Sequence, residues 1–252
     1  MIKRRHLLSL LAYGALPCAW AQTSSSFPSK ALRIVVPFGA GGVADLTARA
    51  VAQKISENLG QAVVIDNRPG AGGRLAAELL KSAAPDGNTV MVTPIVVPVL
   101  APMVFNKLSY NPETDFAPIG KVCDFSFALA VSSNSPVKNL KDYASWLKAN
   151  PQQANFGSPA AGSTPHFVGS LLGLTTGVEL KHAAYRGTQP AMADLLGGNL
   201  AAVSGPIGDI TQHLATGKVR ILATSGAKRN RFAPDVPTFA EQGFKNMVHS
   251  EW

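Results

Sequence analysis

The chain has 252 residues, with 23 Lys and Arg against 15 Asp and Glu, a formal net charge of +8 and only 2 cysteines. Charged residues make up 15% and hydrophobic residues 46%, which excludes a disordered chain, and two cysteines exclude a disulfide scaffold. The length allows one large domain or two domains of roughly 100–150 residues each.

The first 21 residues are typical of a secretory signal peptide. Residues 3–5 are basic, and the apolar stretch 7–18 is shorter than the roughly 20 residues that a membrane-spanning helix needs. Small residues at Ala19 and Ala21 predict cleavage after Ala21 and export to the periplasm, with an uncleaved anchoring helix as the alternative. Cleavage would leave 20 basic and 15 acidic residues, a net charge of +5, and Cys123 as a single thiol, which we interpret as structural.

After this segment, predicted strands and helices alternate. Apolar residues recur at spacings of three and four over 42–59, which predicts a helix that ends at Gly60. Strands are predicted at 31–36, 62–65, 89–93, 116–122, 125–131, 154–156, 179–183, 200–204 and 219–224. Helices are predicted at 42–59, 73–84, 140–149, 164–176, 189–196 and 206–216. This alternation predicts an α/β fold with mostly parallel sheets covered on both faces.

Three glycine-rich loops follow predicted strands and lead into helices. They are PFGAGGVAD at 37–45, NRPGAGG at 67–73 and GSPAAGSTPH at 157–166. Glycines let the backbone turn so that its N–H groups can point at an anion, and the helix dipole adds to the attraction. Because ligands of open α/β sheets bind beyond the carboxyl ends of the strands, we predict a carboxylate or phosphate site there. The alternative is that the glycines serve only turns and helix ends.

A nucleotide enzyme is the main competing interpretation. Gly39-x-Gly41-x-x-Ala44 satisfies the dinucleotide fingerprint, and Asp66 ends the second predicted strand where a ribose-binding acid would stand. An NAD(P)-dependent oxidoreductase would use these residues. The predicted export disfavours this interpretation, because little NAD is present outside the cytoplasm.

Other chemistry finds little support in the sequence. There is no nucleophile elbow, no paired Cys-x-x-Cys and no His-Glu-x-x-His motif, so we predict no catalytic residue, no metal site and no cofactor. His166 lies in the third glycine-rich loop and is either a ligand contact or a hydrogen-bonding partner of the helix start. Basic residues are dispersed apart from 228–231, which disfavours nucleic-acid binding.

The order of short motifs resembles one known family. IVVPF at 34–38, NRPGAGG at 67–73, APDG at 84–87 and DFAPI at 115–119 are followed by the loop at 157–166, DLLGG at 194–198 and PDVPT at 234–238. Across nearly the whole chain, this series is similar to the substrate receptors of tripartite tricarboxylate transporters, the Bug-type solute-binding proteins.

The resemblance implies a two-lobed periplasmic binding protein fold that closes on a small carboxylate. It places a first lobe at 22–130 and 223–252 and a second lobe at 131–222, after the signal peptide at 1–21. Ligand contacts carried over from the family are Phe38, Gly41, Gly42, Asp45, Thr93, Ser158, Gly162, Ser163, Thr164, Tyr185 and Arg186.

Two residues depart from the family's pattern. Arg186 stands where members usually carry Lys, and a guanidinium can bind a carboxylate through two hydrogen bonds. Ser204 stands near the position where many members have an acidic ligand contact. Members also continue beyond a Trp such as Trp252, so the resemblance implies that the C-terminal part of the first lobe is missing.

From these observations we expect a monomeric receptor and not an enzyme, with no stable membrane insertion. Its partners would be a small carboxylate and the membrane subunits of a transporter. A ligand-sensing receptor without a transport role stays open as an alternative.

Overall fold

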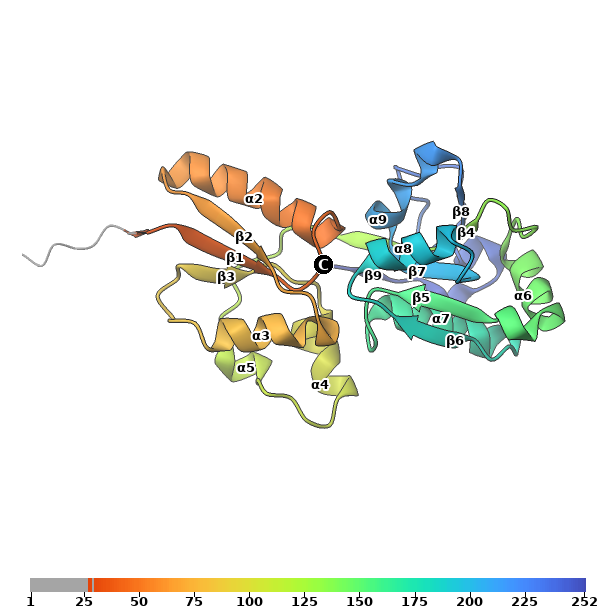
Figure 1. The fold of residues 1–252 in the computed structure, drawn as a ribbon, viewed down its shortest axis with the longest axis horizontal. Coiled ribbons are helices and arrows are strands. Elements are labelled where there is room, and N and C mark those ends of the chain that lie inside the picture. Colours follow the sequence, from red (N-terminus) through yellow and green to blue (C-terminus); the bar gives the residue numbers. More distant parts are fainter. Residues whose placement is uncertain (1–26, 29) are drawn as a thin grey trace, which may run out of the picture.

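A computed structural model describes residues 27–28 and 30–252 (Figure 1). The predicted signal peptide and its cleavage site lie outside the described residues. The described chain forms two lobes, each built on its own sheet. We call residues 30–124 the first lobe and residues 125–252 the second lobe. No described helix is both long enough and apolar enough to cross a membrane.

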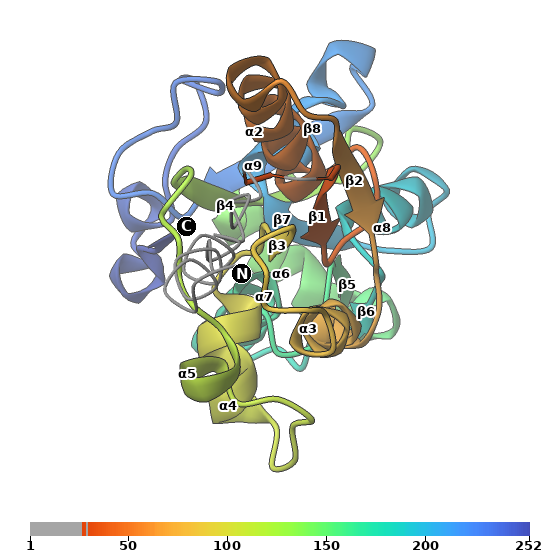
Figure 2. The same ribbon diagram turned by 90° about the vertical axis from the view of Figure 1, so that its left-hand side faces the viewer.

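The first lobe has a three-stranded parallel sheet in the order β2-β1-β3. Its strands are β1 (Leu32–Val36), β2 (Val63–Asn67) and β3 (Thr89–Met91), and its longer helices are α2 (Val43–Leu59) and α3 (Arg74–Lys81). Shorter turns are η1 (Ala71–Gly73), η2 (Val96–Leu100), α4 (Ala101–Val104) and α5 (Pro112–Asp115). Helices α2 and α3 lie on opposite faces of the sheet (Figure 2). Apolar residues Ile34 and Val36 of β1 therefore pack against Ala48 and Ala52 of α2.

The second lobe has a six-stranded sheet in the order β6-β5-β7-β4-β8, with β9 also paired to β4. Its strands are β4 (Phe125–Ser132), β5 (Asn155–Ser158), β6 (Lys181–Ala184), β7 (Ala202–Pro206), β8 (Val219–Thr224) and β9 (Ser250–Glu251). Its helices and single turns are α6 (Leu140–Ala149), η3 (Pro151–Gln153), α7 (Thr164–Thr176), α8 (Thr188–Leu196), α9 (Ile207–Thr211), η4 (Leu214–Thr216), η5 (Ala240–Gln242) and η6 (Lys245–Met247). Strand β4 runs antiparallel to β7, β8 and β9, whereas β5 is parallel to β6 and β7. The prediction of mostly parallel sheets is confirmed.

Most predicted elements occur within a few residues of their expected bounds, but two differ. The strand predicted at 116–122 is wrong, because that segment pairs with no strand and Ile119 is 84% exposed. Pro118 interrupts it and cannot donate a backbone hydrogen bond. The helix predicted at 206–216 is divided into α9 and η4.

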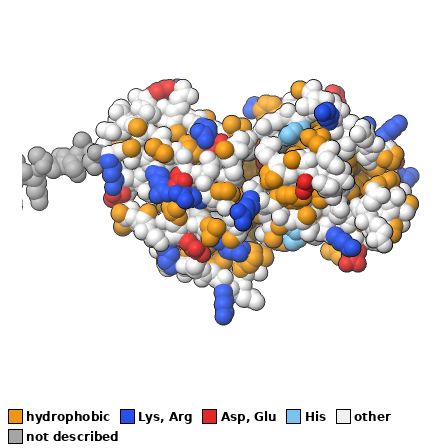
Figure 3. All heavy atoms as spheres, in the orientation of Figure 1, with side chains coloured by type: hydrophobic (Ala, Val, Ile, Leu, Met, Phe, Trp, Pro, Cys, Tyr) orange, Lys and Arg blue, Asp and Glu red, His pale blue; other side chains and the backbone are white. Residues whose placement is uncertain are grey.

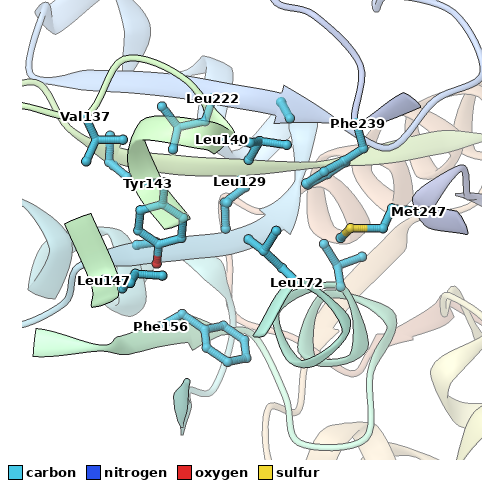
Figure 4. Close-up of a cluster of buried hydrophobic side chains, with 14 of the residues drawn as sticks. Leu129, Val137, Leu140, Tyr143, Leu147, Phe156, Leu172, Leu222, Phe239 and Met247 are labelled. Atoms are coloured by element: carbon cyan, nitrogen blue, oxygen red, sulfur yellow. The ribbon is translucent and has the colours of Figure 1, made fainter. Parts of the chain in front are cut away.

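The sheets also group the chain differently from the predicted lobe boundaries. Strands β4 and β8 lie side by side in the second sheet, and the predicted boundaries near residues 130 and 223 fall within these two strands. Phe239 and Met247 are buried in the core of the second lobe together with Leu129 and Leu172 (Figure 4). In this structure, Phe239 and Met247 therefore pack in the core of the second lobe, while Glu251 and Trp252 line the cavity between the lobes.

Candidate functional site

A cavity of about 1740 Å³ lies where the two lobes meet and extends along the first lobe. Figure 3 shows the molecular surface narrowing at this junction. Phe38 and Gly42 line the cavity from the first lobe, and Ser163, Arg186 and Asp209 line it from the second.

Three helices begin at this cavity. The N-cap residues of α2, α7 and α8 are Gly42, Ser163 and Gly187, and none of the three caps its helix through a side-chain hydrogen bond. The first N–H groups of a helix have no partner inside the helix, and they carry the positive end of its dipole. The cavity therefore brings together three helix starts, of which the start of α2 is bonded to the protein's own acids through Val43 N and Gly41 N.

The loop at 37–45 is held by Asp45, whose side chain is 2% exposed. Its carboxylate accepts hydrogen bonds from Gly41 N (2.9 Å), Arg49 Nε (2.9 Å) and Asn67 Nδ2 (3.0 Å). Burial raises the pKa of Asp45, but these hydrogen bonds outweigh burial and hold the pKa below its usual value. Gly41 has a φ of +83°, in the region that favours glycine. Asp45 thus fixes the loop and does not line the cavity.

The hydroxyl groups of the loop at 157–166 bond to neighbouring parts of the chain. Ser158 Oγ is fully buried and donates to Ala160 O (3.1 Å), and Ser163 Oγ donates to the same oxygen (2.7 Å). Thr164 Oγ1 donates to Glu251 Oε1 (2.7 Å). Of these three predicted ligand contacts, Ser163 alone lines the cavity. The loop's backbone N–H groups are therefore better placed to bind an anion than its hydroxyls.

Two histidines stack behind the same loop. The ring centroids of His166 and His182 are 3.9 Å apart, and Gly162 N donates to His166 Nδ1 (3.2 Å). Burial lowers the pKa of His166, and burial together with the neighbouring His166 lowers the pKa of His182 to about 4. Both rings are therefore neutral near pH 7. His166 is a partner of the helix start and lies outside the cavity lining, as does Gly162.

The remaining predicted contacts divide between the cavity and the core. Thr93 and Arg186 line the cavity, and among the described residues Arg186 forms no salt bridge. The Tyr185 hydroxyl instead donates to Asp194 Oδ2 (2.6 Å), and its ring packs against the core of the second lobe. Burial first, and then Asp194, raise the pKa of Tyr185 to about 12.

Sequence reasoning missed Asp209 on α9, an acid that joins the two lobes. Its Oδ1 accepts from Val43 N of the first lobe (2.6 Å), and its Oδ2 accepts from the Thr188 hydroxyl of the second (2.5 Å). Asp209 is 4% exposed, and this burial raises the pKa of its carboxyl. The sequence did carry a signal for this residue: Asp209 is the one acid in the segment 202–210, and it comes three residues after the end of strand β7. Glu251, also buried in the cavity wall, was missed as well.

The two lobes leave little room between their backbones at this junction. A Cβ atom on Gly39 would lie 3.6 Å from Arg186 O, and one on Gly72 would lie 3.4 Å from Ala161 O. Gln212 Nε2 also donates across the junction to Gly41 O (3.4 Å). The two lobes are thus in direct contact beside the cavity.

The profile of a family described as "Tripartite tricarboxylate transporter family receptor" matches residues 47–252. The chain belongs to this family. A solved structure 33% identical to this chain is the periplasmic binding protein BugD, and another, MatC, holds malate, so the function of these relatives is substrate binding and not catalysis.

Three relatives illustrate the similarity. A Cupriavidus necator protein named for the gbd 5′ region is 35% identical over 251 residues, which are 96% of this chain and 75% of that protein. The MatC protein of Rhodopseudomonas palustris, solved with bound malate, is 31% identical with a TM-score of 0.84 over 90% of this chain and 77% of that one. Another R. palustris protein, solved with adipate, is 32% identical with a TM-score of 0.86 over 90% and 76% of the two chains.

The competing interpretation as a dinucleotide-binding enzyme needs Asp66 to be free to bind a ribose, and it is not. Asp66 is bound by the guanidinium groups of Arg33 and Arg68, with Arg68 Nε at 2.8 Å. Its carboxylate is therefore engaged at the edge of the sheet, away from the residues that line the cavity. Among the described residues, no group of three His, Cys, Asp or Glu side chains is arranged to hold a metal ion.

Proposed function

We propose that this chain captures a small carboxylate between its lobes in the periplasm and presents it to the membrane subunits of a tripartite tricarboxylate-type transporter. Export would use the predicted signal peptide, with cleavage after Ala21. The observation that carries the proposal is the convergence of the N-termini of α7 and α8 and of the Arg186 side chain on one cavity. Relatives that hold malate and adipate support the same ligand class.

Binding would combine backbone donors with one cation. The first N–H groups of α7 and α8 would bind a carboxylate, and Arg186 on the cavity wall would add charge-assisted hydrogen bonds. Because Ser158 and Thr164 are already hydrogen-bonded within the protein, their role is to hold the loop in shape. Closure of the lobes would exclude water and strengthen these contacts. The closed form is then the state that a membrane partner would recognise.

The ligand class can be tested by thermal-shift measurements on the purified chain. We would screen malate, adipate, citrate, benzoate, glutamate, NAD⁺ and NADH, and confirm hits by isothermal titration calorimetry. A ligand that binds only the native state raises the melting temperature by mass action. We expect stabilisation by at least one carboxylate and none by the dinucleotides. Stabilisation by NAD⁺ or NADH with no response to any carboxylate would refute the proposal.

The site itself can be tested with a matched pair of variants. Arg186→Gln removes the cation on the cavity wall and is expected to weaken a carboxylate hit about tenfold or more, since hydrogen bonds to charged groups contribute roughly 1.5–3 kcal/mol. Arg231→Gln makes the same change at an exposed side chain that lies over the Phe232 ring, outside the cavity. If the two variants bind the carboxylate with equal affinity, Arg186 does not contact the ligand.

A further inference from the structure

Asp209 is a buried acid that forms no salt bridge among the described residues. Its partners are the Val43 N–H at the start of α2 and the Thr188 hydroxyl at the start of α8. Its negative charge is therefore stabilised by two hydrogen-bond donors and by the positive ends of two helices. None of the described Lys or Arg side chains pairs with it.

The start of α2 holds a second acid of the same chain. Asp45 accepts from Gly41 N, one residue before the N-cap, while Asp209 accepts from Val43 N, one residue after it. Two carboxylates thus already neutralise the positive end of this helix. The sequence analysis assigned that helix end to the carboxylate of the ligand, and in this structure the protein supplies an acid of its own there.

The starts of α7 and α8 differ in this respect. The acid nearest to α7 is Glu251, which bonds to the Thr164 hydroxyl and not to a backbone N–H. At α8, Asp209 likewise bonds to the Thr188 hydroxyl. Arg186 precedes α8 and lines the same cavity. The start of α7 and the Arg186 side chain therefore offer donors and positive charge to an anion, whereas Asp209, which contacts the starts of both α2 and α8, repels a further anion beside it.

We propose that Asp209 determines ligand specificity: its carboxylate takes the place of a second ligand carboxylate at the start of α2, so the closed cleft favours monocarboxylates over dicarboxylates of the same length. This inference rests on the proposed function, because it presumes that the cavity binds carboxylates. The far end of the ligand would be neutral or would donate a hydrogen bond to Asp209.

The test compares acids that differ by one carboxylate. Affinities for hexanoate and adipate, and for butyrate and succinate, are measured by calorimetry on the wild type and on Asp209→Asn. Asparagine keeps the shape and can still accept from Val43 N, but it removes the charge. Asp142→Asn makes the same charge change at a partly exposed position on α6, at the far end of the second lobe from the cleft (Figure 1).

We expect the wild type to bind each monoacid more tightly than its diacid. In Asp209→Asn the ratio of affinities should move toward the diacid by about tenfold, because a like charge no longer faces the second carboxylate. Asp142→Asn should leave the ratio unchanged. A loss of structure would lower both affinities together and leave their ratio unaltered, so the ratio separates specificity from folding.

Two results would overturn the inference while leaving the proposed function intact. One is carboxylate binding with a ratio that is the same in the wild type and Asp209→Asn. The other is a wild type that binds adipate at least as tightly as hexanoate, and this comparison decides the question if the variant does not fold. Failure of every mono- and dicarboxylate to bind either protein would instead refute the proposed function, and this inference with it.

Discussion

Replacing Glu251 by glutamine should change how the stability of the protein depends on pH. Glu251 lies on β9 and is 5% exposed, and it accepts a hydrogen bond from the Thr164 hydroxyl. It forms no salt bridge with any described residue. Burial raises the pKa of this carboxyl from 4.5 to about 7, although the Thr164 bond opposes the rise. In the folded protein Glu251 therefore keeps its proton through a range in which the unfolded chain has lost it.

The sign and size of the effect follow from this difference in bound protons. Between the ordinary value of 4.5 and the folded value of about 7, unfolding releases a proton, so the free energy of unfolding falls as the pH rises. At 1.36 kcal/mol for each pH unit, the loss is about 3 kcal/mol by pH 8. Glutamine stays neutral and still accepts from Thr164. Glu251→Gln should therefore match the wild type near pH 4.5 and be about 3 kcal/mol more stable at pH 8.

Melting curves followed by circular dichroism at pH 4.5, 6 and 8 measure this difference. For a chain of this size, 3 kcal/mol corresponds to a rise of about 6–12 °C in melting temperature. Glu113→Gln, at an exposed position on α5, is the control and should follow the wild type at every pH. A variant whose advantage is the same at pH 4.5 and pH 8, or which is less stable at pH 8, would show that Glu251 is not a buried neutral acid.

Three further predictions concern the supports of the site. Gly169→Ala should lower stability by about 1–3 kcal/mol in melting experiments, since a Cβ there would lie 2.1 Å from Phe156 Cε2; unchanged melting would contradict the close packing. Asp45→Asn should cost about 1–3 kcal/mol at pH 7 by weakening the bond from Arg49. The difference should shrink as the pH falls from the ordinary pKa of 3.8 through the lowered pKa of the folded acid, and a difference that does not depend on pH would argue against an ionised Asp45. In NMR titration His182 should have a midpoint near 4, so stability should decline as the pH falls from about 6.5 toward that value, and a midpoint near 6.5 would refute its burial.

The helices of the second lobe could be predicted well because their signals are local. Helix α7 begins after Ser163, with a proline in its first turn, and ends at Gly177, which has a φ of 68°. Its predicted bounds are confirmed, as are those of α6. The segment at 116–122 is also rich in apolar residues. A strand, however, needs a neighbouring strand to hydrogen-bond with, and among the described residues this segment pairs with none. No property of the segment alone could reveal that.

The site was predicted in part for the same reason. The glycine-rich loops follow strands in the sequence, so their place at the cavity follows from topology. What each side chain does there depends on residues far away in the chain. Asp45 is hydrogen-bonded to Asn67, and Thr164 to Glu251. Asp209 is hydrogen-bonded to Val43, which lies 166 residues away in the sequence. Only the folded arrangement brings these partners together, and so Asp209 was missed.

The reliance on backbone N–H groups at the starts of α7 and α8 affects how this receptor can diverge. A main-chain donor is present whichever residue occupies the position, proline excepted, so substitutions cannot easily remove it. Variation at Thr93, Arg186 and Asp209 can therefore alter which acid fits while the grip on one carboxylate is retained. Such a scaffold can acquire new ligands in single steps, without passing through a form that binds nothing.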